Sequence, residues 1–470
     1  MKTSPPPLNN ISPEIKFLGV EEYTPVTSEK LDPVCVIYRK ALDFPPDYKG
    51  ERPRFVYAAC YYLNGRLDLF SLHETSDENL DLSNLSKYFQ FWHPGLRFFE
   101  LEPVEIPKPW GKEIWFTGIE NRGISRISIR PVPAKEKGKP RADGTSNLLI
   151  SFMQLFGNQF LTPSTPVLLK ILSPRPDPRT GNLYYELHEK KQEVYVVSNI
   201  GSSNGAPGKM KYGISEKKKQ QFSSEEKFKA AFLEALVRYE KIRAEVDEKL
   251  SLILEERNLD FQQAHDQDVY NTLKQSLETS LLDLEEQAKR EVESFVGWMD
   301  LGVGDVIAVE THVPHSLQHG VEVIEFQTPV YERSILSFDQ KVLTQNHWDC
   351  EKAVNAMKLV APKKQPLSKS NRFEGSGLTC LLVASFDDFE VFKIEFKGIH
   401  TLEPIVGHAI CYQLQGSSKV SFDTKHNQST EDKDLFFSET SKAYFIPEVI
   451  DKITLESEHS VILLTCEKRG

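Results

Sequence analysis

This chain of 470 residues lacks the features that mark membrane and secreted proteins. It has no run of about 18 apolar residues, so no membrane span is expected. Its start, Met1 to Pro7, has no apolar core typical of a signal peptide. The six cysteines are scattered and form no Cys-x-x-Cys pair. We therefore expect a cytoplasmic protein with mostly buried, reduced thiols.

Strong positive charge is also missing from the sequence. The formal net charge is −11, and the short basic run from Lys217 to Lys219 is expected to lie in a solvated loop. No nucleic-acid partner is therefore expected. With 39% hydrophobic and 27% charged residues, the composition is that of a globular protein. The length predicts two or three domains.

Short β-strands are predicted over most of the chain. Near the N-terminus, Arg54 to Leu63 and Leu67 to Leu72 flank Asn64-Gly65, which is a hairpin signal with a type I′ turn. We predict a small β-rich module at residues 1–106. Short strands separated by turns resume after Pro107, and they recur over residues 373–470 with the rhythm of a second barrel or sandwich.

Residues 222–297 interrupt the strands with a helical pattern. Ser223 and Glu226 form a capping-box signature at the start of this stretch. Apolar residues then recur at helical spacing from Phe228 to Val246, and again from Val269 to Phe295. The pattern predicts two long amphipathic helices in an antiparallel pair. They would pack against the strands, although a lid or a dimer contact is an alternative.

Two distant pieces of chain carry histidines and glutamates with the spacing of one metal site. Glu186 and His188 are two residues apart, so they lie on the same face of a strand and can bind one ion. A turn after His188 would bring Glu193, at the start of the next strand, beside them. His315 follows Pro314 in the second piece and would supply the fourth ligand.

Two histidines and two glutamates form an N2O2 set that suits a divalent metal. Zinc is the first candidate, and iron, manganese or nickel fit as well. The alternative is that His188 and His315 are hydrogen-bonded interior residues of a lineage that lost the metal. Two further histidines, His312 and His319, are expected to form hydrogen bonds rather than to bind the ion.

These motifs resemble the cupin superfamily and, within it, type I mannose-6-phosphate isomerases, over about residues 107–345. That family binds zinc through Gln-x-His, a Lys-Pro-Glu glutamate and a Pro-His histidine, and it carries a helical insertion between the two motifs. Glu186 stands here at the Gln position, which adds negative charge. Lys191-Gln192-Glu193 stands at Lys-Pro-Glu. The segments Lys108 to Gly111 and Tyr331-Glu332-Arg333 resemble two further family segments.

The resemblance implies a mainly β fold. Residues 107–345 would form a metal-binding cupin (jelly-roll) β-barrel with the helical insertion at 222–297. Residues 366–470 would form a second, degenerate cupin-like β-domain without a metal, in which His408 has no partner at ligand spacing.

The resemblance also implies a metal-dependent sugar or sugar-phosphate isomerase, which interconverts an aldose and a ketose through a metal-stabilised enediolate. Glu325 is then the candidate base, Lys191 assists the proton transfer, and Arg333 binds a phosphate or another anionic group. An ion pair of Glu325 or Arg333 is the alternative for those two residues. Two other functions stay open: another metal-dependent cupin enzyme such as an iron oxygenase, and a non-catalytic carbohydrate-binding protein.

Overall fold

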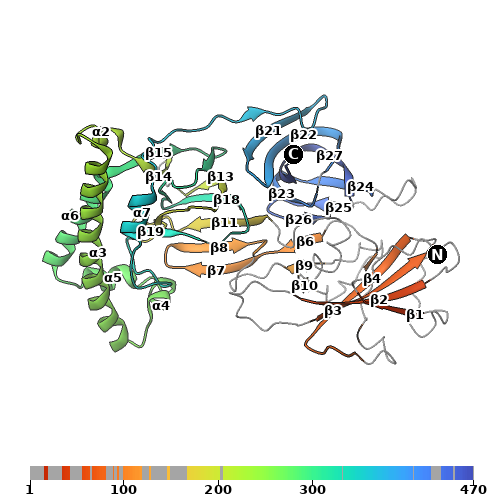
Figure 1. Cartoon of the computed structure of the whole chain (residues 1–470), viewed down its shortest axis with the longest axis horizontal. Coiled ribbons are helices and arrows are strands. Elements are labelled where there is room, and N and C mark those ends of the chain that lie inside the picture. The colour runs from red at the N-terminus through yellow and green to blue at the C-terminus, as the bar shows by residue number, and fades with distance from the viewer. Residues whose placement is uncertain are drawn as a thin grey trace. The chain divides into compact units, whose positions relative to one another are not determined.

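A computed structural model describes the chain at residues 15–19, 34–42, 55–63, 66–80, 88, 93–94, 99–118, 126–128, 146–148, 167–201, 205–330, 332–405, 407–424, 436–447 and 450–468. The fold is mainly β, as the sequence predicts, with several antiparallel sheets (Figure 1). The chain divides into two compact units. One unit contains Glu105–Trp115 and Leu168–Leu367, and the other contains Met1–Val104, Phe116–Val167 and Ser368–Gly470.

The first of these units contains two facing sheets. One sheet has the order β16 (Val306–Val309), β13 (Glu193–Ile200), β18 (Val321–Gln327), β11 (Leu168–Pro174), β8 (Gly111–Trp115) and β7 (Val104–Lys108). The other has the order β15 (Val296–Leu301), β14 (Gly208–Ile214), β17 (His315–Leu317), β12 (Tyr185–Leu187) and β19 (Ser334–Ser337). Neighbouring strands among β11 to β18 pair antiparallel.

Strand order identifies this pair of sheets as a jelly roll. Numbered along the chain from β11 to β18, the first sheet contains strands 1, 8, 3 and 6, and the second contains strands 2, 7, 4 and 5. That is the order of two interlocked Greek keys, so the predicted jelly roll is confirmed. Alternate side chains of both sheets meet in one apolar core, to which Leu172, Val197 and Val323 contribute from one sheet and Met210 and Leu317 from the other.

The helical segment lies between β14 and β15. It consists of α2 (Glu216–Lys219), α3 (Glu225–Glu256), α4 (Phe261–Asp266), α5 (Tyr270–Gln275) and α6 (Thr279–Phe295). The N-cap of α3 is Ser224, one residue after the predicted Ser223, because the Ser224 side chain accepts the N–H of Lys227. The second predicted helix is divided between α5 and α6, since the Ser276 hydroxyl bonds the Leu273 carbonyl and helps end α5.

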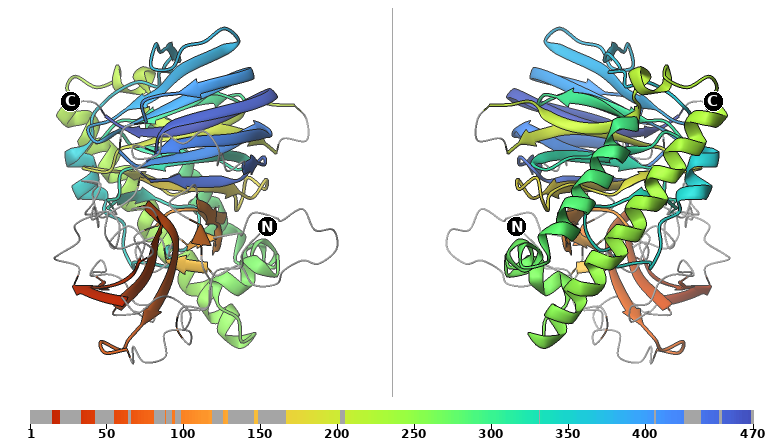
Figure 2. Two further views of the ribbon diagram at one scale, coloured as in Figure 1. Left: turned by 90° about the vertical axis from the view of Figure 1, so that its right-hand side faces the viewer. Right: turned by 90° about the vertical axis from the view of Figure 1, so that its left-hand side faces the viewer.

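Helices α3 and α6 run antiparallel, as predicted. Their ion pairs join Arg238 to Glu291 and Lys249 to Glu278, so residue numbers rise on one helix as they fall on the other. The right-hand view of Figure 2 shows the two helices side by side. Their apolar faces pack on strands β12, β14 and β19, where Phe232 and Phe295 share one cluster with Leu187. Packing against the jelly roll therefore accounts for one part of the apolar stripes, and the rest, from Val246 to Leu254 on α3 with Leu273 and Leu281, packs within the helical segment.

The C-terminal strands repeat the same strand order. They are β20 (Ser368–Lys369), β21 (Leu378–Ser385), β22 (Phe389–Leu402), β23 (Ala409–Gly416), β24 (Ser418–Thr424), β25 (Phe436–Ser438), β26 (Ala443–Ile446) and β27 (Ile450–Glu467). The long strands β22 and β27 pair along their lengths and bulge near Gly398. One half of this ladder continues into β23 and β26, and the other half into β24 and β25. Counting each long strand as two gives a second jelly roll around an apolar core.

N-terminal strands form a separate sheet of β1 (Ile15–Gly19), β2 (Val34–Ala41), β3 (Phe55–Leu63), β4 (Arg66–Thr75) and β5 (His93–Pro94). Strands β3 and β4 pair as the predicted hairpin, whereas its Asn64-Gly65 turn lies outside the described residues. Strands β6 (Phe99–Glu102), β9 (Arg126–Ser128) and β10 (Ser146–Leu148) join the C-terminal sheet through β26. The predicted domain at residues 107–345 had included β9 and β10, because a short-strand pattern does not reveal distant partners. The ranges 1–106, 107–345 and 366–470 stay predictions as folding domains.

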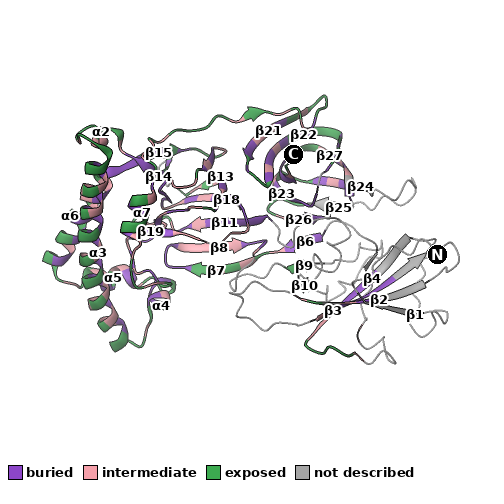
Figure 3. Ribbon diagram, viewed as in Figure 1, coloured by how far each residue is buried: buried purple, intermediate pink, exposed green. Residues whose placement is uncertain are grey.

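Figure 3 shows how burial is distributed over these elements. The five cysteines whose surroundings are described, Cys60, Cys350, Cys380, Cys411 and Cys466, are buried thiols. Among the helices in the described part of the chain, none has the length and hydropathy that a membrane span requires.

Candidate metal centre

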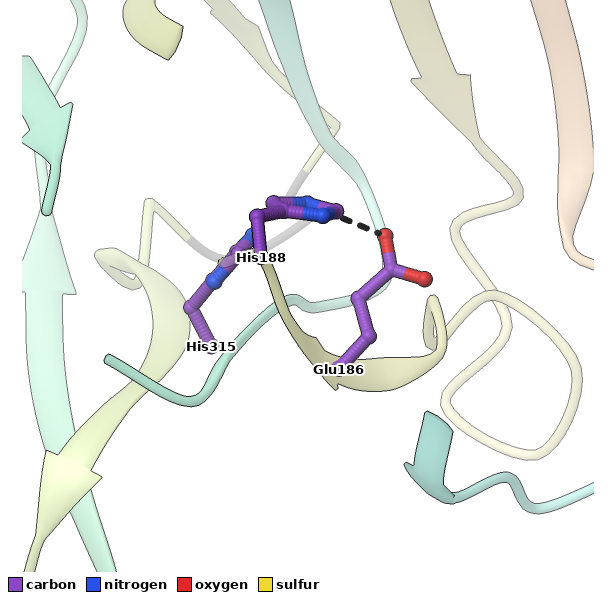
Figure 4. A group of neighbouring side chains, drawn as sticks. All are labelled: Glu186, His188 and His315. Carbon is purple, nitrogen blue, oxygen red and sulfur yellow. Dashed lines mark ion pairs between the residues drawn. The ribbon is translucent and has the colours of Figure 1, made fainter. Parts of the chain in front are cut away.

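The four predicted ligands come together at one end of the first jelly roll. Glu186 lies on β12, His188 directly follows that strand, and Glu193 is the first residue of β13. His315 begins β17 and pairs directly with Glu186 across the ladder. Figure 4 shows Glu186, His188 and His315 converging from two segments of chain. The fold therefore positions the two motifs as the spacing predicts.

Distances within the cluster are short enough for one ion. Donor atoms of Glu186, His188 and His315 all lie within 4.8 Å of one another. The Glu193 Oε1 atom lies 2.9 Å from His315 Nε2 and 3.5 Å from His188 Nε2. Both histidines are 2% exposed and Glu193 is 0% exposed, so bulk water does not screen the site.

Hydrogen bonds at the far side of each imidazole fix its tautomer. The Nδ1 of His188 lies 2.7 Å from the Glu332 carbonyl, and the Nδ1 of His315 lies 3.0 Å from the Val313 carbonyl. A carbonyl oxygen only accepts, so each Nδ1 carries the proton. Both Nε2 atoms, which have no hydrogen-bond partner, then present lone pairs to the cluster.

These lone pairs face carboxylate oxygens, which is an unfavourable arrangement unless a cation lies between them. Burial alone would raise the pKa of Glu193, but the positive charge of Lys191 lowers that pKa well below its usual range, so the carboxylate is charged. Burial, with the nearby charge of Lys191, lowers the pKa of His188, so the imidazole is neutral. A neutral imidazole and an ionised carboxylate are the forms that bind a divalent metal, and this donor set fits one.

A row of buried charges continues from the cluster along the inner face of the first sheet. The Lys191 Nζ atom lies 2.6 Å from Glu193 Oε2 and 3.8 Å from Glu325 Oε1. Lys170, directly opposite Glu325 on β11, lies 3.2 Å from its other oxygen. Burial raises the pKa of Glu325 to about 8, with Lys170 opposing the shift and Glu193 adding to it. Glu325 and Lys191, both predicted from the sequence, thus lie beside the predicted metal ligands.

Lys170 is a site residue that the sequence analysis missed. Its signal was a single lysine within the otherwise apolar run Leu168–Leu172, where a side chain of the inner face must find a buried partner. The row extends further to Glu113, whose pKa is lowered to about 2 because Lys108 and Lys170 outweigh the effect of burial. Lys108 lies 3.0 Å from Glu113, which gives the Lys-Pro-Trp-Gly segment a contact with this row.

Arg333 lies on the other side of the cluster. Its Nη1 atom is 3.6 Å from Glu186 Oε2, and its Nη2 donates to the Thr344 hydroxyl at 2.9 Å. The guanidinium carbon lies 4.6 Å from the centre of the Tyr184 ring. Its ion pair is therefore with the metal-ligand candidate Glu186, while Glu325 pairs with two lysines.

Other residues complete the surroundings. The Tyr195 hydroxyl donates to Glu193 Oε1 at 2.9 Å. Tyr195 was not predicted as a site residue, but it lies two residues after Glu193, and this spacing puts both side chains on the same face of the strand. His312 adopts a positive φ of 66° in the turn before Pro314, and its buried Nδ1 atom has no hydrogen-bond partner, so the predicted hydrogen bond is not seen at that atom. His319 bonds Asn182 at 3.0 Å through Nδ1, so its predicted hydrogen-bonding role is confirmed. Tyr331 lies outside the described residues.

Known proteins are similar to this chain in structure and not detectably in sequence. No family model and no curated protein matches the sequence. Solved structures similar to this chain include mannose 6-phosphate isomerase from Bacillus subtilis, with a TM-score of 0.49 and 14% identity over 78% of this chain and 99% of that chain. They also include a putative mannosephosphate isomerase from Archaeoglobus fulgidus (0.45, 13%, 79% and 98%) and a zinc-bound mannose 6-phosphate isomerase (0.48, 12%, 79% and 100%).

Proposed function

We propose that this chain is a metal-dependent isomerase that interconverts an aldose and a ketose of a sugar or sugar phosphate. The observation that carries the proposal is the convergence of Glu186, His188 and His315, with the buried Glu193 in contact with both imidazoles and with a lysine–glutamate row. The proposal rests on this geometry and on the motif resemblance rather than on overall structural likeness. Glu186, His188, Glu193 and His315 would hold the metal, with zinc the first candidate.

A divalent metal at this position would stabilise negative charge on substrate oxygens while a proton moves between neighbouring carbons. Glu325 would take and return that proton, because a pKa of about 8 lets the carboxyl group exchange protons near neutral pH. Lys170 holds one Glu325 oxygen at 3.2 Å and thereby orients the group. Lys191, between Glu193 and Glu325, would donate a hydrogen bond to a substrate oxygen.

Arg333 would bind an anionic group of the substrate at the edge of the site. Its side chain is 15% exposed, and guanidinium donors suit phosphate oxygens. Mannose 6-phosphate is therefore the first substrate to test, since it is the substrate of the isomerases that the motifs resemble.

The proposal is tested by metal content and turnover of protein purified without added metal. We expect about one zinc or other divalent ion per chain by elemental analysis, and conversion of mannose 6-phosphate to fructose 6-phosphate. His315→Gln should lose both the ion and the turnover. His319→Gln is the matched control, because His319 bonds Asn182 and should keep both. A wild-type protein that neither contains nor takes up a metal would overturn the proposal.

The assignment of Glu325 has its own test. Glu325→Gln keeps the shape and removes the exchangeable proton, so kcat should fall by about 10²- to 10⁴-fold at unchanged metal content. An unchanged kcat would remove Glu325 from the mechanism, and a lost metal would mean that its role is structural.

A further inference from the structure

The two-residue segment Glu332-Arg333 contacts the metal-ligand hairpin, residues 186–193, in three places. The Glu332 Oε1 atom accepts the backbone N–H groups of Glu189 and Lys190 at 2.7 and 2.8 Å. It also accepts the N–H of Lys191 at 3.2 Å. Three consecutive amides directed at one carboxylate oxygen form an anion-binding nest. This nest lies in the turn that separates the ligand His188 from the ligand Glu193.

The same segment makes contact with two ligand side chains. The Glu332 backbone carbonyl accepts the His188 Nδ1 proton at 2.7 Å, which directs the Nε2 lone pair into the cluster. The Arg333 guanidinium is 3.6 Å from Glu186 Oε2, so Oε1 is the oxygen left toward His188, at 3.8 Å. Stacking on Tyr184 and the bond to Thr344 hold the guanidinium in that position.

We propose that Glu332 is a positioning residue for metal binding, whose side chain holds the turn of the ligand hairpin so that His188 and Glu193 meet at one point. This inference rests on the proposed metal site. Without the Glu332 carboxylate, the amides of residues 189–191 lose their acceptor, and the turn can adopt several conformations in the metal-free protein. The metal would then have to order the hairpin on binding, which weakens its affinity.

Competition with a chromophoric chelator, using Zn²⁺ as the probe, tests this inference. Glu332→Ala should raise the zinc dissociation constant by about 10- to 100-fold, the range typical of partners that orient metal ligands. Glu332→Gln keeps an acceptor oxygen without the charge, so its loss should be smaller. Glu189→Gln is the matched control, because it makes the same charge change in the same turn but removes only the 2.8 Å ion pair with Lys352. Its dissociation constant should stay within about threefold of wild type.

The possible outcomes separate this inference from the proposed function. Wild-type protein that binds no zinc overturns the metal site itself, and the inference with it. If Glu332→Ala binds zinc as tightly as the wild-type protein, the inference is overturned and the proposed function is not. This holds even if the melting temperature of the metal-free variant falls. If Glu332→Ala does not fold, Glu332→Gln decides: affinity equal to that of Glu189→Gln contradicts the positioning role, and a weaker affinity supports it.

Discussion

In the first jelly roll, the third and eighth strands pair Tyr195 with Glu325, and the first strand places Lys170 beside them. In the second jelly roll, the corresponding strands pair Cys411 with Leu464, and Phe392 takes the place beside them. The strand order is the same, but one interior is charged at the site and the other is apolar throughout this row. The comparison shows that the fold does not require buried charges at these positions.

Charged side chains buried in the first jelly roll destabilise the fold unless each has a close partner of opposite charge. An ionised group that leaves water loses several kcal/mol of hydration, which only close pairing offsets. Lys170, Glu325, Lys191 and Glu193 alternate between basic and acidic side chains along the row, with contacts of 3.2, 3.8 and 2.6 Å. An apolar row such as Phe392–Leu464–Cys411 avoids that cost. A row of buried charged side chains that carries this cost in only one of the two jelly rolls is consistent with a function there.

The largest loss of stability is expected when one charged residue of the row in the first jelly roll is replaced by its apolar counterpart from the second. Glu325→Leu copies Leu464 and leaves the buried Lys170 without its carboxylate, which should cost about 3–5 kcal/mol of unfolding free energy. Lys170→Met combined with Glu325→Leu should recover much of that loss. Tryptophan fluorescence in urea can follow the change, since Trp110, Trp115, Trp298 and Trp348 lie in this unit. A single variant as stable as wild type would mean that the row is not tightly coupled.

Metal removal should destabilise the first jelly roll and leave the second unchanged, with a smaller effect than the Glu325→Leu substitution. At a free metal concentration about 100 times the dissociation constant, binding stabilises the folded state by about 2.7 kcal/mol. Chelation should therefore lower the unfolding midpoint of the unit with Glu193 and His315. Hydrogen exchange of strands β22 and β27 in the second jelly roll should not change. Equal loss of protection in both regions would contradict a site confined to the first.

Acid should destabilise the helical insertion of the first jelly roll, which lies between β14 and β15. The second jelly roll has no insertion of this length, because only residues 425–435 separate the equivalent strands β24 and β25. Burial lowers the pKa of His265, in α4, to about 3, compared with 6.5 for an exposed histidine. The unfolded state therefore takes up the proton first, so the His265 contribution is complete above pH 6.5 and is lost as the pH falls toward 3. His265→Phe should flatten this part of the stability–pH curve. An unchanged curve would assign acid sensitivity to other groups.

Much of the fold and site was predictable from the sequence, because the signals were local. The spacing of Glu186 and His188 predicts that both point the same way, although His188 directly follows β12 and does not lie on it, and Pro314-His315 marks a second ligand segment. Helical periodicity predicted the insertion, although the cap of α3 lies one residue later and the second helix is divided. The pairing of strand β9 with β6, and of β10 with β9, was not predicted, since strand pairing over long sequence distances leaves no periodic signature.

The sequence by itself determined which side chains were available for a metal and which segments alternate or coil. Tertiary structure alone decided that Lys170 lies opposite Glu325 and that the Glu332 carboxylate accepts amides from residues 189–191. The physical reason is that periodicity acts between neighbours along the chain. Pairing of buried charges instead acts between strands about 150 residues apart, once the sheets have brought them together.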